Sequence, residues 1–296
     1  MKKLTSAHCR DPYVIYHNNA YYRCFSFGQA SIGVSRADSI DGLRDAPIVT
    51  VYTAPEGTDY SRELWAPELH VIGGKCYIYV ACDNGENRNH RMYVLENGSD
   101  DPLHPYTMHG KITDPSDKWA IDGTVCRLGD KEYFLWSGWE GDVNGCQDLY
   151  IAEMADPFTL RGERHRISRP TLEWEKRGAS ATLPLINEGP FVISQNGKQY
   201  ILYSASGSWC EHYCLALLEW TGGDPLDKES WIKHPSPLLC ANEQLKGAGH
   251  ASVLTDADGT HIFFHAWDKD ETNIRWNTVS AWHGILAEEN GSPVIR

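Results

Sequence analysis

Five similar stretches follow one another along the 296-residue chain. Each has a short apolar strand, a turn such as Asn-Asn, Gly-Gly or Asn-Gly, and a second strand rich in aromatic and β-branched residues, which is the pattern of a β-hairpin. The stretches are DPYVIYHNNAYYRCFSF from Asp11, APELHVIGGKCYIYVACD from Ala66, DGTVCRLGDKEYFLWSG from Asp122, EGPFVISQNGKQYILYSAS from Glu188 and HASVLTDADGTHIFFHAW from His250. A repeat of this kind constrains the fold more than composition does, because each unit must bury its apolar face against a neighbour.

The repeat also has a regular spacing. A large residue opens the second strand of each unit, and these anchors lie 55, 56, 67 and 62 residues apart, at Tyr22, Tyr77, Tyr133, Tyr200 and Ile262. A third apolar strand follows each hairpin, in ASIGVSRA, HRMYVLEN, QDLYIAEM, YCLALLEW and NIRWNTVS. Units of three or four strands at this period are typical of propeller blades. The sequence therefore predicts an all-β, five-bladed β-propeller that includes residues 1–296 as one domain.

The first residues of the five stretches form a set of their own. In a propeller the innermost strands line a central channel, so equivalent residues of those strands should ring one end of it. Those residues are Asp11, Ala66, Asp122, Glu188 and His250. One Asp before Gly or Pro is ordinarily a turn former, and one His is ordinarily a neutral core residue. Three acids and a histidine in five equivalent positions indicate a functional cluster, because like charges repel when they are brought together and desolvated.

Clustered carboxylates in an aromatic-rich pocket suit glycoside hydrolysis. One carboxyl group gives a proton to the leaving oxygen, while another, ionised, activates water or attacks the sugar. Neighbouring charge separates their pKa values, so that both roles coexist. Trp65, Trp139 and Trp209 lie near predicted strand ends and are candidates for stacking on sugar rings, although core packing is the simpler interpretation for each. The alternative from another class is a non-catalytic sugar-binding or scaffold propeller, which would not need three acids around one channel mouth.

The amino-acid composition excludes some classes of binding partner. The net charge is −13 and is spread along the chain, which argues against nucleic acid or an anionic membrane but not against a neutral oligosaccharide. No apolar run approaches the roughly 20 residues that span a bilayer. The nine cysteines form no CxxC pair, and scattered thiols suit a reducing compartment. The start, MKKLTSAH, lacks the apolar stretch of a signal peptide. We therefore expect an unexported, cytoplasmic protein, and the sequence leaves its oligomeric state open.

Several motifs resemble those of a known family. RDPYVI, SRELWAPELH, WAIDGTV, INEGPFVI and GAGHASVL, one for each predicted blade and in this order, resemble glycoside hydrolase family 43. NHRMYVLE, KITDPSDKWAIDGTV, FLWSGWEGDVNGCQDLYIA and ILYSASGSW are similar to the α-L-arabinofuranosidases of that family. The likeness extends from Cys9 to about Trp267.

The resemblance implies a five-bladed propeller and an inverting mechanism. By motif, Asp11 is the general base, Glu188 the general acid, and Asp122 the residue that orients the acid and tunes its pKa. His250 matches a position that helps to hold calcium or another cation in the channel, often through water, although Ala251 departs from the Gly-His-Asn or Gly-His-Gly of many members. Arg275 is a candidate sugar-binding residue.

The predicted function is therefore the exo-acting release of terminal α-L-arabinofuranosyl residues from arabino-oligosaccharides. No organic cofactor is expected. β-Xylosidase, endo-arabinanase and galactan-directed exo-activity stay open as specificities of the same fold.

Overall fold

The computed structural model describes residues 1–28, 30–275 and 277–296. Strands dominate this part of the chain, and its only helices are four short 3₁₀ turns. The all-β prediction is confirmed. The 3₁₀ turns are η1 (Asp41–Arg44), η2 (Asn87–Asn89), η3 (Glu173–Lys176) and η4 (Lys228–Ser230). No helix in the described residues is long and apolar enough to cross a membrane.

The strands fall into antiparallel groups that follow the five sequence units. The first group is β2 (Tyr13–His17), β3 (Ala20–Phe27), β4 (Ser31–Ala37) and β5 (Ile48–Thr53). The second is β6 (Arg62–Ile72), β7 (Lys75–Asp83), β8 (Arg91–Glu96) and β9 (Thr107–Lys111). The third is β10 (Ala120–Leu128), β11 (Lys131–Gly138), β12 (Cys146–Asp156) and β13 (Thr159–Ser168). The fourth is β14 (Leu185–Gln195), β15 (Lys198–Ala205), β16 (Cys214–Trp220) and β17 (Trp231–Lys233). The last is β18 (Leu245–Asp256), β19 (Gly259–Asp268), β20 (Ser280–Glu289) and β21 (Ser292–Ile295), joined by β1 (Lys2–His8).

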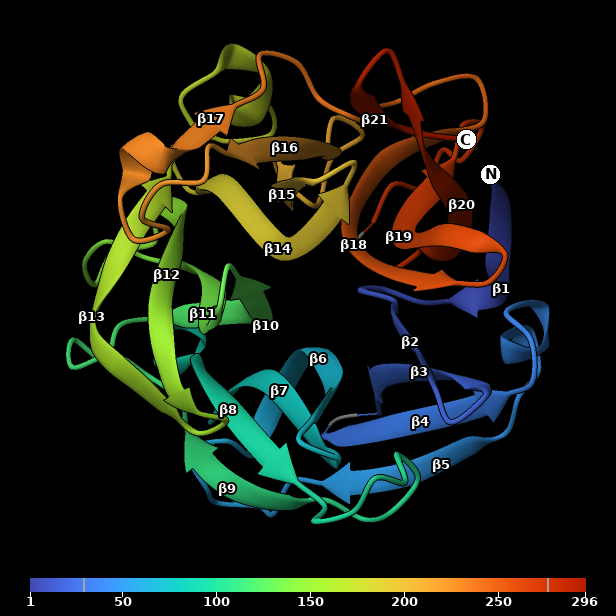
Figure 1. Cartoon of the computed structure of the whole chain (residues 1–296), viewed down its shortest axis with the longest axis vertical. Helices are drawn as coiled ribbons and strands as arrows, with labels where there is room; N and C mark the ends of the chain where they lie inside the picture. The colour runs from blue at the N-terminus through green and yellow to red at the C-terminus, as the bar shows by residue number, and fades with distance from the viewer. Residues whose placement is uncertain (29, 276) are drawn as a thin grey trace.

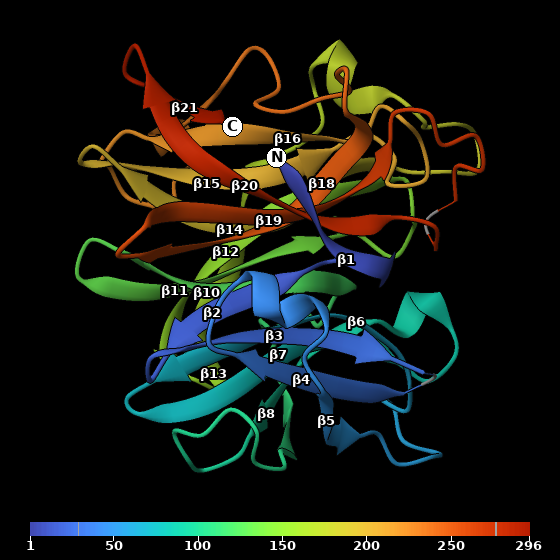
Figure 2. The ribbon, with the colours of Figure 1, turned by 90° about the vertical axis from the view of Figure 1, so that its right-hand side faces the viewer.

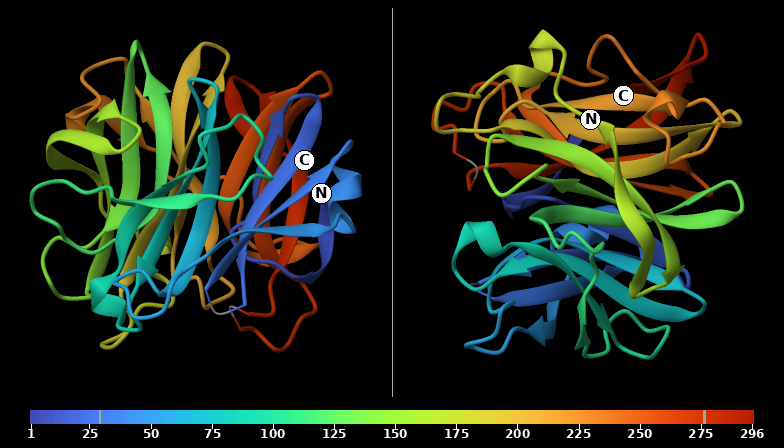
Figure 3. Two further views of the ribbon diagram at one scale, coloured as in Figure 1. Left: turned by 90° about the horizontal axis from the view of Figure 1, so that it is seen from below. Right: turned by 90° about the vertical axis from the view of Figure 1, so that its left-hand side faces the viewer.

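These groups succeed one another around the centre of the molecule, with β2, β6, β10, β14 and β18 innermost (Figure 1). In side view the strands run from one face of the molecule toward the other (Figure 3). The innermost strands therefore bring residues that are far apart in sequence to a shared central region.

Hydrogen bonding joins the groups into four sheets. The third and fourth groups form one eight-stranded sheet, because β12 and β14 share two parallel pairs, Cys146 with Leu185 and Gln147 with Ile186. Apolar side chains fill the spaces between neighbouring groups. One buried cluster, for example, combines Tyr22 and Val34 of the first group with Leu69 and Ile78 of the second.

The two ends of the chain meet in the last group. Strand β1 pairs antiparallel with β20, so that Lys2 lies opposite His283. Figure 2 shows this blue N-terminal strand beside the red C-terminal strands. Residues from both ends therefore complete one sheet.

One predicted strand is wrong. The sequence predicts the third strand of the last unit in NIRWNTVS, residues 273–280, but that place is taken by β20, which begins at Ser280, and Trp276 lies outside the described residues. Residues 271–275 form no regular structure. Their backbone instead accepts a hydrogen bond from a core residue. The Trp267 indole donates to the carbonyl oxygen of Arg275 at 3.0 Å.

Candidate active site

A backbone bulge recurs where the innermost strands begin. In β6, β10, β14 and β18, two residues lie opposite one residue of the partner strand, and the first of the two has a left-handed φ. These residues are Ala66 (+44°), Asp122 (+55°), Gly189 (+55°) and His250 (+50°), and Asp11 has φ +47° just before β2. Such a conformation costs a non-glycine residue roughly 1–2 kcal/mol. Backbone conformations of this kind are concentrated at functional sites, where they redirect a side chain.

The bulges correct the alignment of two units. Gly189, and not Glu188, occupies the position equivalent to Asp122, so the acid comes from the residue before the bulge. In the last unit the residue equivalent to the tyrosine anchors is His261, opposite Leu254, and not Ile262. With both corrections, the distance from the left-handed residue to the anchor is 11 residues in all five units.

The predicted catalytic residues line one cavity. It has a volume of about 430 Å³ and its walls include Asp11, Asp122, Glu188, His250 and His265. Asp122, Glu188 and His250 are buried, and the side chain of Asp11 is 21% exposed. A larger cavity of about 630 Å³ adjoins it and shares Arg10, Asp11 and Trp65. The structure therefore brings together the four charged or titratable residues that the sequence placed at the axis.

Two histidines surround the Asp11 carboxylate. Nδ1 of His250 lies 3.2 Å from Asp11 Oδ1 and 3.7 Å from Asp122 Oδ2. Nδ1 of His265 lies 3.2 Å from both Oδ1 and the backbone nitrogen of Asp11. Burial acts to raise the pKa of Asp11, but His250, followed by His265, outweighs it, and the pKa lies well below the usual range. Asp11 is therefore ionised at neutral pH.

The pKa values of the other two carboxyl groups shift in the opposite direction. Burial, and then the nearby Asp122, raise the pKa of Glu188 to about 8. Burial also raises the pKa of Asp122 to about 6, against the attraction of His250. The backbone N–H of Gly189 donates to Asp122 Oδ2 at 3.1 Å, which favours the ionised form of Asp122. Near pH 7 the cavity thus holds a protonated Glu188 beside an ionised Asp11.

The same charges act on His250. Burial disfavours its charged ring, but Asp11, Asp122 and Glu188 together raise its pKa to about 9. A histidine must be neutral to bind a metal directly. The described residues contain no group of three or more His, Cys, Asp and Glu side chains placed to hold a metal ion. The donors therefore do not fit a directly coordinated calcium, and a cation held through water stays a prediction.

The predicted sugar-binding residues divide into two pairs. Trp65 and Trp209 line the cavity. Trp65 stacks on His90 with ring centroids 4.0 Å apart, and the Trp209 indole donates to the Gly178 carbonyl oxygen at 3.0 Å. Trp139 and Arg275 are not among the residues that line the cavity. Trp139 is buried, and Arg275 is exposed.

Three residues of the site gave no signal in the sequence. Trp119 lines the cavity and stacks on Trp139, with ring centroids 4.6 Å apart. His265 comes from β19, and Tyr213 precedes β16 and donates to Glu188 Oε1 at 2.8 Å. None of them lies on an innermost strand, where the repeat directed attention. A search of the second strands for polar residues at the level of the bulges would have found His265, which lies opposite Gly249.

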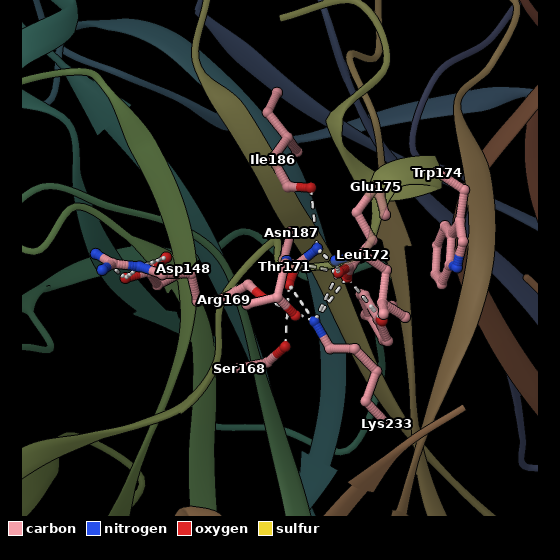
Figure 4. A network of polar contacts seen from close by, with 12 residues as sticks. Asp148, Ser168, Arg169, Thr171, Leu172, Trp174, Glu175, Ile186, Asn187 and Lys233 are labelled. Carbon is pink, nitrogen blue, oxygen red and sulfur yellow. Dashed lines mark hydrogen bonds and ion pairs between the residues drawn. The ribbon is translucent and has the colours of Figure 1, made fainter. Parts of the chain in front are cut away.

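A buried polar network supports the strand that carries Glu188 (Figure 4). At its centre the buried Glu175 carboxylate accepts from Lys233 Nζ at 2.7 Å and from Asn187 Nδ2 at 3.0 Å. It also accepts from the backbone nitrogens of Thr171 and Leu172, both at 2.8 Å. Because Asn187 directly precedes Glu188, the network fixes the backbone from which the acid projects.

Replacing Lys233 with methionine is expected to lower the free energy of unfolding by about 3–5 kcal/mol, because it leaves the Glu175 carboxylate buried without its cation. Urea unfolding followed by tryptophan fluorescence measures this change. The control is Lys198→Met, which removes an exposed ion pair with Glu219 and should have little effect. A Lys233→Met protein as stable as the parent would contradict this account of the network.

Comparison with known proteins identifies the family. The pattern of "Glycosyl hydrolases family 43" matches residues 4–281. The chain belongs to this family. The prediction made from its motifs is confirmed.

Relatives of this family member include named arabinofuranosidases. The chain is 34% identical over 271 residues to the "Extracellular exo-alpha-(1->5)-L-arabinofuranosidase" of Streptomyces avermitilis, covering 89% of this chain and 55% of that protein. It is 31% identical over 265 residues to the protein of the same name from Streptomyces chartreusis, covering 86% and 79%. The chain thus spans about half the length of the first relative. The crystal structure of an alpha-L-arabinofuranosidase from Lactobacillus brevis matches with a TM-score of 0.85 and 30% identity, over 96% of this chain and 92% of that one.

The cytoplasmic prediction is wrong. Both Streptomyces relatives are named extracellular, which points to secretion. The prediction relied on the first residues and on the scattered cysteines, and neither feature indicates the compartment of this protein. Lys2–His8 is a strand of the folded sheet, and five of the nine free cysteines are buried, where they pack as small apolar residues whatever the compartment.

Proposed function

We propose that this protein is an inverting, exo-acting α-L-arabinofuranosidase that removes terminal α-L-arabinofuranosyl residues from neutral oligosaccharides. Family membership and the names of the relatives support the reaction class and the sugar. The observation that carries the mechanism is the different surroundings of two carboxyl groups in one cavity. Glu188 is buried, and burial raises its pKa, whereas Asp11 lies 3.2 Å from the Nδ1 atoms of His250 and His265, which hold its pKa low. Two carboxyl groups whose environments separate their pKa values are suited to acid and base roles.

We also propose that the strand groups form a single five-bladed propeller, with the catalytic cavity at its axis. The order of the groups around the centre supports this architecture (Figure 1). The pairing of β1 with β20, which joins the two ends of the chain in one blade, supports it as well. The left-handed backbone that recurs at these positions, within a bulge at Asp122 and His250 and just before β2 at Asp11, turns the three side chains toward the axis.

In the proposed reaction Asp11 takes a proton from water while the water oxygen bonds to the anomeric carbon. The bond from that carbon to the leaving oxygen breaks, and Glu188 gives its proton to the leaving sugar. Asp11 then holds one proton more than before and Glu188 one fewer, so exchange with solvent restores both. Burial, and then the negative charge of Asp122, keep the pKa of Glu188 high. The charged ring of His250 keeps Asp11 ionised.

The substrate assignment is tested with 4-nitrophenyl glycosides and with arabinan. The α-L-arabinofuranoside is expected to be hydrolysed much faster than the β-D-xyloside, and arabinan is expected to yield arabinose from the first minutes. Faster cleavage of the xyloside would assign the protein as a β-xylosidase. Early release of arabino-oligosaccharides would assign it as an endo-arabinanase.

A further inference from the structure

The Glu188 carboxyl group accepts a hydrogen bond from a buried tyrosine. The Tyr213 hydroxyl donates to Glu188 Oε1 at 2.8 Å. Ser204 acts to lower the pKa of Tyr213, and its Oγ accepts from the backbone N–H of His250 at 2.7 Å. Ser204, Tyr213 and Glu188 are all buried.

The Tyr213 hydroxyl is the donor of this hydrogen bond. Burial, and then the Glu188 carboxylate, raise the pKa of Tyr213 well above its usual value, so the hydroxyl stays protonated at any working pH. Whenever Glu188 is ionised, its Oε1 can only accept.

The Tyr213 ring is held in one place. It lies against Gly249, where a Cβ atom would come within 1.8 Å of the ring, so no side chain fits there without moving the tyrosine. Its other neighbour is His265, with ring centroids 5.5 Å apart and planes at 16°. His265 in turn contacts the base, Asp11. The hydroxyl of Tyr213 therefore has a defined position relative to both proposed catalytic carboxylates.

We propose that Tyr213 is a positioning residue that holds Glu188 Oε1 as a hydrogen-bond acceptor, so that the proton transferred in catalysis resides on Oε2. This inference rests on the proposed role of Glu188 as the acid. The tyrosine does not itself donate to the substrate. Its hydrogen bond strengthens as Glu188 loses its proton, because hydrogen bonds to a charged acceptor are stronger. Tyr213 thus stabilises the carboxylate that forms when the leaving sugar departs.

The test is Tyr213→Phe, which removes the hydroxyl and keeps the ring. The titratable groups that face Glu188 are Asp122, His250, Tyr213 and Asp11, and only Tyr213 is altered. Loss of a donor to the ionised form raises the pKa of the acid, so the basic limb of kcat/KM should move about 1 pH unit upward. Activity on arabinobiose should fall roughly 10–100-fold. Activity on 2,4-dinitrophenyl arabinofuranoside, whose leaving group needs no proton, should fall much less.

The matched control is Tyr203→Phe. Tyr203 is also fully buried and donates to a carboxylate, Glu175 Oε1 at 3.0 Å, but outside the cavity. The Tyr203→Phe variant should be less stable than the parent, but the basic limb of its kcat/KM profile should not move. Should Tyr213→Phe fail to fold, Ser204→Ala is the second variant. Ser204 lowers the pKa of Tyr213, so its removal makes the tyrosine a weaker donor and should move the basic limb in the same direction by less. A basic limb that stays in place, or moves to lower pH, in the folded variant would overturn the inference. If Glu188→Gln leaves arabinobiose hydrolysis intact, the proposed function itself fails, which is a separate result.

Discussion

Replacing Asp11 with glycine is expected to lower kcat/KM roughly 10²–10⁴-fold on every arabinofuranoside, whatever the leaving group. The reason is that the attacking water loses the group that takes its proton. Glycine is the informative choice because Asp11 has a left-handed backbone, with φ +47°, which glycine adopts without strain. Measurement of kcat/KM on arabinobiose and on 2,4-dinitrophenyl arabinofuranoside tests whether both losses are similar.

The control for this variant is Ala66→Gly. Ala66 has the equivalent left-handed position, with φ +44°, and carries no functional group, so this change should preserve activity. Azide gives a second measurement, because an anion that needs no base can attack the anomeric carbon in the space that Asp11→Gly opens. Azide should restore activity and yield the arabinosyl azide of inverted configuration. If proton NMR shows that the parent enzyme's first product retains the substrate's configuration, Asp11 is not a base.

The repeat explains how much of the site could be predicted. Asp11, Asp122 and His250 are predicted because each opens one of the five repeated units, and those units are visible in the sequence. Two positions in that alignment are wrong. Ile262 fits the pattern of large apolar anchors, whereas the equivalent residue, His261, is buried and pairs with His283 and Asp256. Glu188 opens its unit in the predicted alignment, although the adjacent Gly189 has the left-handed backbone that marks this position in the other units.

Residues outside the innermost strands could not be predicted in the same way. Tyr213 belongs to a connection between β15 and β16, and its contact with Glu188 depends on a loop whose path no local pattern specifies. The sequence-based candidates include Trp139 and not Trp119, although the two rings are stacked and Trp119 is the one that lines the cavity. Only the packing of the two rings decides which of them faces the cavity.

The second large effect is expected from Glu188→Gln. The amide keeps the size of the side chain and its oxygen can still accept from Tyr213, so the change removes mainly the transferable proton. On arabinobiose, whose leaving group is a sugar hydroxyl, kcat/KM should fall roughly 10²–10⁴-fold. On 2,4-dinitrophenyl arabinofuranoside the variant should keep far more activity, because a stable phenolate departs without a proton. The ratio of the two losses measures general acid catalysis directly.

The pH profile adds an independent test. Glu188 must be protonated to act, so the parent enzyme should lose activity on arabinobiose as the pH rises through about 8, the pKa to which burial and Asp122 raise this group. In Glu188→Gln that limb should disappear. Glu68→Gln is the control, because Glu68 is another buried glutamate but is hydrogen-bonded to His70, at 2.8 Å. The basic limb should persist in that variant. Equal losses on both leaving groups in a folded Glu188→Gln protein would show that the proton comes from another residue.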